Sequence, residues 1–397
     1  MPLDLVNTLS ELVSIPSVNP MGRPVSGPEF FEYRVTDYLE RLFDDLGLAW
    51  RRQPVAPKRE NIIARLDGER PVSEGGKLLL WEAHQDTVPV DGMTIEPWTP
   101  TVRDGRIYGR GACDIKGGMC AMLGALARLA DERPEGMPTI VMACTVNEEH
   151  GFTGASALAE LWEGENESLI QRRPDAAVIA EPTNLNVVVA HKGALRWRCR
   201  TRGRAVHSSQ PHLGDNALYK MSHVLQALRA YQENATPTIT EHPLCGPATL
   251  SVGTISGGIS VNTVPDECTI EIDRRLLPGE DSDQVFEEIR RYLADFSGVD
   301  FEIDHEPPFM KGLALSDDQN GALANRLADV GREALGACDL IGVAYGTDAS
   351  VIAAADVPSV VFGPGSIEQA HTCDEWLSLD ELERASEVLY RFGLAGM

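Results

Sequence analysis

The chain has 397 residues and a formal net charge of −25, and 43% of its residues are hydrophobic. This length allows two domains, and the composition is that of a globular chain. The acidic charge disfavours nucleic acid and anionic lipid as partners. No apolar run reaches the length of a membrane span, and the start, "MPLDLVNTLSELVSIPSVNP", lacks the pattern of a signal peptide. We therefore expect a cytoplasmic protein with no membrane or nucleic-acid partner.

The first half of the chain alternates between helix and strand patterns. Apolar residues at three- and four-residue spacing predict helices in "LVNTLSELVSI" and "GPEFFEYRVTDYLERLFDDLG". Four strand-like runs follow, with two helical stretches among them: "NIIARLD", "KLLLWEA", the helix "GGMCAMLGALARLADE", "PTIVMACTV", the helix "TGASALAELWE" and "DAAVIA". This alternation indicates an α/β layer structure.

The pattern changes near Ala190 and changes back after Met310. Between these points the predicted order is βαββαβ, which is the split βαβ or ferredoxin-like arrangement. After Met310 the α/β style resumes with "NGALANRLADVGREAL", "VPSVVFGPG" and a last helix, "DELERASEVLYRFGL". We therefore predict a discontinuous outer domain, residues 1–190 and 310–397, and an inserted domain, residues 191–309.

Residues that can bind metal follow several of the predicted strands. In open α/β sheets, ligands bind just beyond the carboxyl ends of the strands. Five segments place histidines or carboxylates at such ends or, for one acid, in the glycine-rich loop "GRGACDIKGGM": His84 and Asp86, Glu148 and Glu149, Glu181, His371, and Asp114. A set of two histidines and three carboxylates suits Zn²⁺, with Co²⁺ or Mn²⁺ as alternatives. A shared carboxylate would hold two ions about 3.5–4 Å apart.

Each of these features has an ordinary structural explanation when it is taken alone. A His-x-Asp pair is usually structural, and "NEEHG" can be a solvated turn. Glu181 can cap a strand, and Asp114 can be a helix N-cap. His371 can be an exposed surface histidine. The occurrence of all five segments at predicted strand ends or glycine loops favours a metal site.

Six motifs together resemble the co-catalytic zinc peptidase and deacylase family, which includes acetylornithine deacetylase, succinyl-diaminopimelate desuccinylase, aminoacylase and the glutamate carboxypeptidases. The motifs are "HQDTVP", "GRGACDIKGG", "TVNEEHGFTGA", "AEPT", "RGRAVHSS" and "GPGSIEQAHTCDE". The resemblance extends over nearly the whole chain. It implies an amide-bond hydrolase whose catalytic domain has a mixed sheet flanked by helices and whose inserted ferredoxin-like domain forms a homodimer.

The resemblance also implies which residues hold the metal ions. His84 and Glu181 would bind one ion, Glu149 and His371 would bind the other, and Asp114 would bridge the two. Both ions would most readily be zinc.

Two further carboxylates receive catalytic roles from the same resemblance. Asp86 stands two residues beyond His84, so on a strand it returns to the same side and would orient the imidazole. Glu148 would be the general base, which takes a proton from the attacking water and passes it to the leaving amine.

In the inserted domain, the resemblance implies that His207 reaches the active site of the partner subunit and helps to bind the oxyanion. Asn262, Arg275, Gly346 and Thr347 match family positions that contact the substrate. Arg275 can hold a substrate α-carboxylate through two hydrogen bonds. A surface ion pair is the alternative explanation for this arginine.

Three stretches, "VVVAHKGALRW", "DRRLLPGE" and "FGPGSIEQAH", are most similar to the acetylornithine deacetylase branch. This similarity implies a small-molecule N-acyl amino acid as substrate and the conversion of N2-acetylornithine to ornithine and acetate, in arginine biosynthesis. The alternatives are succinyl-diaminopimelate desuccinylase, a metallo-carboxypeptidase or a dipeptidase. A non-catalytic binding protein on the same fold is the alternative from another class. A dinucleotide-binding oxidoreductase is excluded, because "GRGACD" lacks the third glycine at the required place.

Overall fold

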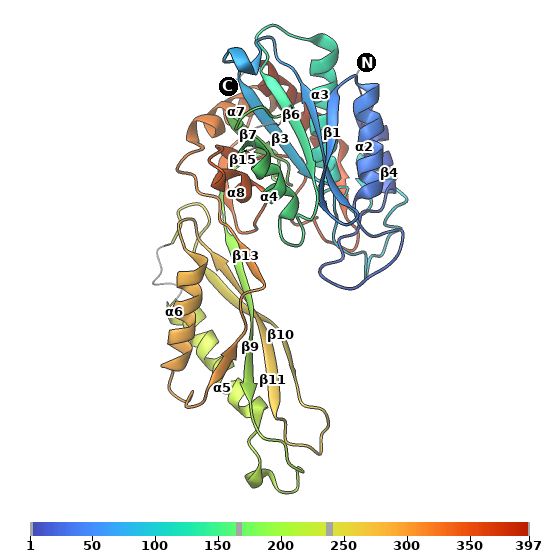
Figure 1. Ribbon diagram of the computed structural model, residues 1–397. Coiled ribbons are helices and arrows are strands. Elements are labelled where there is room, and N and C mark those ends of the chain that lie inside the picture. The colour runs from blue at the N-terminus through green and yellow to red at the C-terminus, as the bar shows by residue number, and fades with distance from the viewer. Residues whose placement is uncertain (1–2, 164–168, 236–240, 396–397) are drawn as a thin grey trace. The chain divides into compact units, whose positions relative to one another are not determined.

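The computed structural model describes residues 3–163, 169–235 and 241–395. The chain divides into two compact units (Figure 1). The larger comprises residues 1–189, 317–341 and 347–397, and the smaller comprises residues 190–316 and 342–346. No helix in these described ranges combines the length and apolar character that crossing a membrane requires.

One mixed eight-stranded sheet forms the centre of the larger unit. In spatial order its strands are β1 (Ala49–Ala56), β2 (Arg59–Leu66), β6 (Thr139–Thr145), β3 (Leu78–His84), β7 (Ala176–Ile179), β15 (Ser359–Val361), β8 (Val187–His191) and β14 (Leu340–Val343). The central pairs β6–β3, β3–β7 and β7–β15 are parallel. The pairs β1–β2, β2–β6 and β15–β8 are antiparallel. The predicted mixed sheet is therefore confirmed.

Helices flank this sheet on both faces (Figure 1). They are α1 (Leu5–Ser14), α2 (Tyr33–Asp45), α3 (Lys116–Glu132), α4 (Thr153–Ala159), α7 (Gly321–Leu335), α8 (Ala349–Ala354) and α9 (Leu379–Ala395), with short 3₁₀ turns at Val72–Glu74 and Glu160–Glu163. Helix α3 packs against α1 and α9, because its many small residues allow close approach. Helices α4 and α8 contact each other on the opposite face.

The strand that ends in His84 is buried on both faces, which explains its uninterrupted apolar run. Leu79, Trp81 and Ala83 belong to the main hydrophobic core, which includes residues of α3 and α9. Because successive side chains of a strand point to opposite faces, Glu82 and His84 point away from that core. The strand therefore delivers His84 to its carboxyl end, on the face that α4 and α8 flank.

A small antiparallel sheet joins two loops that are far apart in the sequence. It consists of β16 (Trp376–Ser378), β5 (Arg106–Tyr108) and β4 (Thr101–Arg103), in that order. Trp376 pairs with Tyr108. The segment that precedes β16 therefore lies beside the glycine-rich loop that follows β5.

The smaller unit has the ferredoxin-like arrangement that the sequence predicted. Its elements are β9 (Gly193–Arg202), α5 (Ala217–Ala230), β10 (Thr249–Gly257), β11 (Glu267–Leu276), α6 (Ser282–Ala294), β12 (Ile303–His305) and β13 (Met310–Gly312), with short helical turns at Pro211–Leu213 and Tyr231–Ala235. The strand order is β10-β11-β9-β12, and β13 also pairs with β9. All these pairs are antiparallel.

Alternation along β9 separates a core face from a charged face. Leu195, Trp197 and Cys199 belong to the core of the smaller unit. Trp197 meets Phe286 of α6 edge to face, with ring centroids 5.5 Å apart. The intervening arginines pair with acidic side chains, as Arg196 does with Asp273 at 2.6 Å.

Backbone pairing extends the smaller unit beyond the range 191–309 that the pattern suggested. Strand β13 pairs with β9, and the backbones of His191 and Leu315 bond to each other. The Lys192 N–H also donates to the Val343 carbonyl at 3.3 Å. These pairings assign the residues up to 316, and residues 342–346, to the smaller unit.

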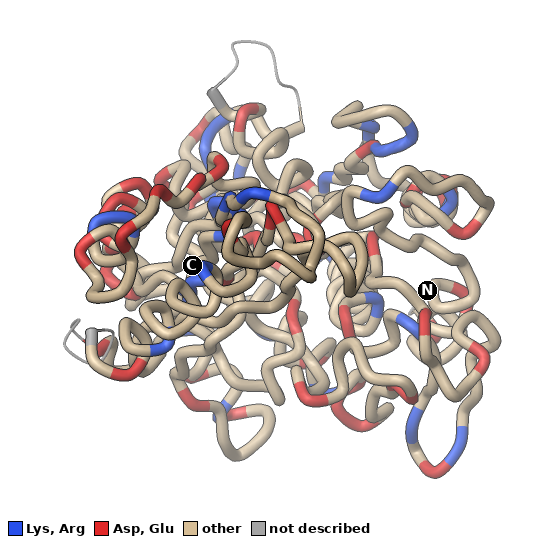
Figure 2. Tube along the Cα trace, turned by 90° about the horizontal axis from the view of Figure 1, so that it is seen from below, with Lys and Arg blue, Asp and Glu red and all other residues tan. Residues whose placement is uncertain are grey.

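Acidic and basic positions are interspersed along the whole trace (Figure 2). The net charge of −25 therefore arises from many scattered acids in both units. Several arginines are paired with these acids, as in the cluster of Arg52 with Asp37, Glu40 and Glu60.

Candidate metal centre

Asp114 lies between two histidines and directs one carboxylate oxygen to each. The Nε2 atom of His84 is 3.2 Å from Asp114 Oδ1, and the Nε2 atom of His371 is 3.2 Å from Oδ2. Glu181 Oε1 is 3.8 Å from His84 Nε2, and Glu149 Oε2 is 3.3 Å from His371 Nε2. All five predicted ligands therefore meet in one cluster, as two groups of three that share Asp114.

The sheet topology explains why ligands so far apart in sequence meet. Strands β6, β3 and β7 are parallel neighbours, so their carboxyl ends lie at one edge. His84 ends β3, and Glu149 and Glu181 follow β6 and β7 by a few residues. Asp114 comes from the loop between β5 and α3, and His371 from the loop between β15 and β16.

The electrostatics of the cluster fit divalent cations. Burial, reinforced by the charge of Asp114, raises the pKa of Glu149 to about 7 and that of Glu181 well above its ordinary value. Burial would also raise the pKa of Asp114, but hydrogen bonds from His371 and His84 outweigh it and lower that pKa. Glu149 Oε1 is buried without a hydrogen-bond partner. A divalent cation bound here would stabilise the charged form of these carboxylates, and Glu149 Oε1 could coordinate it.

Glu148 is buried next to this cluster but belongs to neither group of three. Burial raises the pKa of its carboxyl well above the ordinary value, although the charge of His84 opposes the shift. Its carboxylate therefore lies close to the candidate ligands without being one of them. A raised pKa is what a group that alternates between base and acid requires.

Asp86 makes a different contact from the predicted one. The Nδ1 atom of His84 is 3.0 Å from the backbone carbonyl of Asp86, which accepts its hydrogen bond, and 3.7 Å from the carboxylate. The carboxylate accepts the backbone N–H groups of Glu148 at 3.1 Å and Glu149 at 3.2 Å. It also accepts the side chain of Asn19 at 2.7 Å. Asp86 therefore orients His84 through its carbonyl and fixes the Glu148 loop through its carboxylate.

Three buried residues near the N-terminus support the same loop and were not predicted. Glu32 pairs with Arg59 at 3.0 Å and accepts the Asn147 N–H at 3.3 Å. Asn19 donates to the Asn147 side chain at 3.0 Å. Asn147 has a positive φ of 64°, so these contacts hold a backbone conformation that most residues avoid. No sequence spacing marks these residues, because only the fold brings them together.

The predicted substrate residues lie mostly in the smaller unit. His207 and Asn262 are exposed there on adjacent segments, since the Ser208 N–H donates to the Asn262 carbonyl at 2.9 Å. Arg275 pairs with Asp273 at 3.0 Å, which is the ion pair foreseen as the alternative. Gly346 belongs to the smaller unit and the buried Thr347 to the larger. The structure thus brings His207 and Asn262 together.

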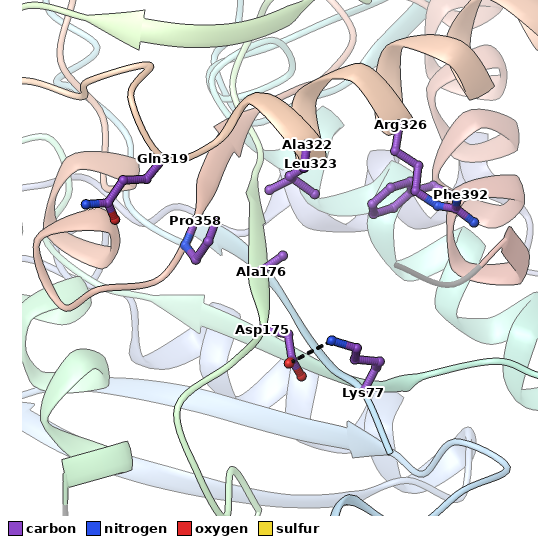
Figure 3. A pocket seen from close by; sticks show the side chains of 9 residues that line it. All are labelled: Lys77, Asp175, Ala176, Gln319, Ala322, Leu323, Arg326, Pro358 and Phe392. Carbon is purple, nitrogen blue, oxygen red and sulfur yellow. Dashed lines mark hydrogen bonds and ion pairs between the residues drawn. The ribbon is translucent and has the colours of Figure 1, made fainter. Parts of the chain in front are cut away.

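A cavity occupies the opposite edge of the main sheet, at the amino ends of β3 and β7 (Figure 3). Its residues are Lys77, Asp175, Ala176, Gln319, Ala322, Leu323, Arg326, Pro358 and Phe392. Asp175 pairs with Lys77 at 3.2 Å and accepts the Leu78 N–H at 2.9 Å. This carboxylate holds a strand start, and none of the predicted ligands lines the cavity.

Comparison with known proteins agrees with this geometry. Residues 80–395 match the model of peptidase family M20/M25/M40. The chain belongs to this family. As a family member it is a hydrolase of amide bonds, which confirms the class that the motifs indicated.

Two relatives of this family member carry different substrate names. An acetylornithine deacetylase of Pectobacterium carotovorum subsp. carotovorum (strain PC1) is 33% identical over 396 residues, which cover 96% of each chain. A probable succinyl-diaminopimelate desuccinylase of Staphylococcus aureus (strain MSSA476) is 28% identical and covers 88% of this chain and 89% of its own. Among solved structures, a dinuclear metal-binding M20 peptidase of Bacillus subtilis superposes with a TM-score of 0.70 at 17% identity, covering 98% and 97% of the two chains. That likeness shows a shared fold.

The shared position of Asp114 leads to a metal-binding prediction. We expect the wild type to retain two divalent ions per chain after dialysis, and Asp114→Asn to lose affinity for both, because it weakens both groups. His371→Ala should lose one ion. The number of metal ions per chain, measured by inductively coupled plasma mass spectrometry, tests this expectation. Glu148→Gln is the matched control and should keep both ions; an Asp114→Asn variant that keeps both would contradict the assignment.

Proposed function

We propose that the chain is a two-metal deacylase that converts N2-acetylornithine to ornithine and acetate. The observation that carries the proposal is the Asp114 carboxylate, with one oxygen toward His84 and the other toward His371, next to the buried Glu148. The acetylornithine deacetylase relative at 33% identity supports the choice of substrate. The proposal includes a role in arginine biosynthesis in the cytoplasm, which follows from the deacetylase assignment.

His84 and Glu181 would hold one ion, Glu149 and His371 the other, and Asp114 both. Their nitrogen and oxygen donors suit zinc, with cobalt or manganese as substitutes. When bound, two such ions supply Lewis-acid polarisation of the amide carbonyl and a lowered pKa of the attacking water.

Glu148 performs the proton transfers in this proposal. Its carboxylate removes a proton from the water that attacks the amide carbonyl, and the tetrahedral species then expels the amine. As the C–N bond breaks, the same carboxyl donates that proton to the nitrogen, and the second proton of the former water passes from the new carboxylic acid to the amine, so acetate and the protonated amine are released. The Asp86 carboxylate accepts the Glu148 backbone N–H at 3.1 Å and so fixes the backbone from which the Glu148 side chain extends.

The smaller unit offers an apolar surface for a second copy of the chain. Tyr219 on α5 is 73% exposed, Ile255 on β10 is 56% exposed, and Ile259 and Val261 beyond β10 are 86% and 101% exposed. Strand β10 lies at the edge of its sheet, where further pairing can occur. We therefore propose a homodimer through this surface. His207, which forms an isolated bridge with Thr263 beside it, would act in the partner's active site.

The desuccinylase relative at 28% identity supports succinyl-diaminopimelate as a second candidate substrate. Both substrates are N-acyl amino acids, and the metal ligands do not distinguish their acyl groups. Residues Asn262, Arg275, Gly346 and Thr347 are our proposed substrate contacts, with Arg275 exchanging Asp273 for a substrate carboxylate.

The substrate proposal predicts a specific order of activities. Zinc- or cobalt-loaded enzyme should release ornithine from N2-acetylornithine faster than it cleaves succinyl-diaminopimelate, acetylmethionine or a dipeptide. A chelator should abolish every activity. If another substrate is cleaved faster in a chelator-sensitive reaction, the hydrolase class stands but acetylornithine is not the substrate. If metal-loaded protein cleaves none of these substrates, a non-catalytic binding protein is favoured.

The proton-transfer role predicts that Glu148→Ala binds metal like the wild type but loses most turnover. General acid–base groups contribute about 10²–10⁴-fold in rate, so kcat should fall by that order. Steady-state kinetics on protein of measured metal content gives the comparison. Glu160→Ala, at an exposed carboxylate of the same unit, is the control and should retain full activity. A Glu148→Ala enzyme with unchanged kcat would rule the role out.

The dimer proposal predicts complementation between two inactive variants. Mixing His207→Ala with Glu148→Ala should restore part of the activity, because a mixed dimer contains one site with both groups intact. The activity of the mixture is measured after subunit exchange. Copies that carry different tags show independently that the exchange has taken place. Exchange without recovery would show that His207 does not act in trans.

A further inference from the structure

The carboxylate of Glu375 receives four hydrogen bonds from the loop that carries Asp114. Its Oε1 atom accepts the backbone N–H groups of Cys113 at 2.9 Å and Asp114 at 3.0 Å. Its Oε2 atom accepts the Gly111 N–H at 3.1 Å and the Arg110 guanidinium at 2.6 Å. Glu375 is 1% exposed, so these bonds replace water completely.

The loop conformation gives this carboxylate its importance. Gly111 adopts a φ of 83°, and a Cβ there would meet the Thr87 side chain at 2.8 Å. The loop thereby turns three N–H groups toward one point, and such a nest binds an anion. Glu375 supplies that anion from inside the protein, and one of the three N–H groups belongs to Asp114 itself.

The small sheet fixes Glu375 in this position. Its backbone carbonyl accepts the Gly109 N–H at 3.0 Å, and the next residue, Trp376, pairs with Tyr108. His371 stands only four residues earlier on the same segment. One short segment therefore supplies a metal ligand and also the acceptor that positions the neighbouring ligand.

We propose that Glu375 is a positioning residue that sets metal affinity by fixing the Asp114 carboxylate between His84 and His371. The proposal rests on the proposed function, since it takes Asp114 as the shared ligand. Glu375 belongs to neither group of candidate ligands, and both its oxygens accept hydrogen bonds from the loop. The competing explanation is a purely structural ion pair with Arg110, which the three backbone bonds argue against.

Glu375→Gln tests the proposal, because it keeps the size of the side chain but removes the charge and turns an NH₂ group toward N–H donors. We expect its affinity for zinc to fall about 10–100-fold, the usual cost of losing a group that orients a metal ligand. Competition with a chromophoric chelator measures that affinity, and the d–d spectrum of the cobalt-loaded protein should change as well. Unchanged zinc affinity in folded Glu375→Gln would overturn the proposal.

Asp175→Asn is the matched control. Asp175 also accepts a backbone N–H and pairs with a cation, but at the opposite edge of the sheet (Figure 3). The Asp175→Asn substitution should lower the melting temperature of the protein without changing its affinity for zinc. If Glu375→Gln does not fold, Glu375→Asp keeps the charge but is one methylene too short to reach all four donors. Its zinc affinity should also fall, and wild-type affinity in Glu375→Asp would equally overturn the proposal.

Asp114→Asn, measured in parallel, separates this proposal from the ligand assignment. If Asp114→Asn binds zinc like the wild type, the assignment of Asp114 as shared ligand has failed. If Asp114→Asn loses zinc while Glu375→Gln keeps it, the ligand assignment stands and only the positioning role is wrong.

Discussion

The site depends on one electrostatic constraint: four carboxylates are buried close together at the carboxyl ends of the central strands. They belong to Asp114, Glu148, Glu149 and Glu181. Two like charges about 4 Å apart at an effective dielectric constant of about 20 repel by about 4 kcal/mol. His84 and His371 lie 3.2 Å from the Asp114 oxygens and offset part of this repulsion when they are protonated, and divalent cations would offset it further. Burial is the main cause of the raised pKa of Glu149, and the charge of Asp114 adds to it. An excess of buried negative charge is what a site for divalent cations requires, and the fold maintains it at this cluster.

The fold maintains that excess by fixing the backbone and leaving the carboxylates little freedom. Asp86 holds the N–H groups of Glu148 and Glu149, and Glu375 holds those around Asp114. In both cases a buried carboxylate outside the two groups of candidate ligands holds a loop that carries one of those candidates. The two anchors come from different parts of the chain, so the arrangement requires both the central parallel strands and the small sheet of β4, β5 and β16.

The sequence predicts this fold and cluster to the extent that local patterns determine them. Strand runs that end in histidine or acid located His84, Glu149 and Glu181, because the parallel centre of the sheet aligns strand ends. Asp86 was among the predicted residues, but Glu375 was not, because its hydrogen-bond partners lie 261 to 265 residues away in the sequence. Strand β1 was missed because it is an edge strand with a proline and two arginines. The short strand β13 has too few residues to show a pattern in the sequence, so the pairing that extends the smaller unit to residue 316 is visible only in the structure.

The order of the ligands along the chain bears on the biogenesis of the enzyme. His84 and Asp114 emerge from the ribosome more than 250 residues before His371 and Glu375. A nascent chain therefore carries the carboxylates of the cluster before it has the second histidine or the anchor for Asp114. The complete site forms only when the segment around β16 adds to the small sheet. We therefore expect the complete metal site to form only after residues 371–375 have been synthesised.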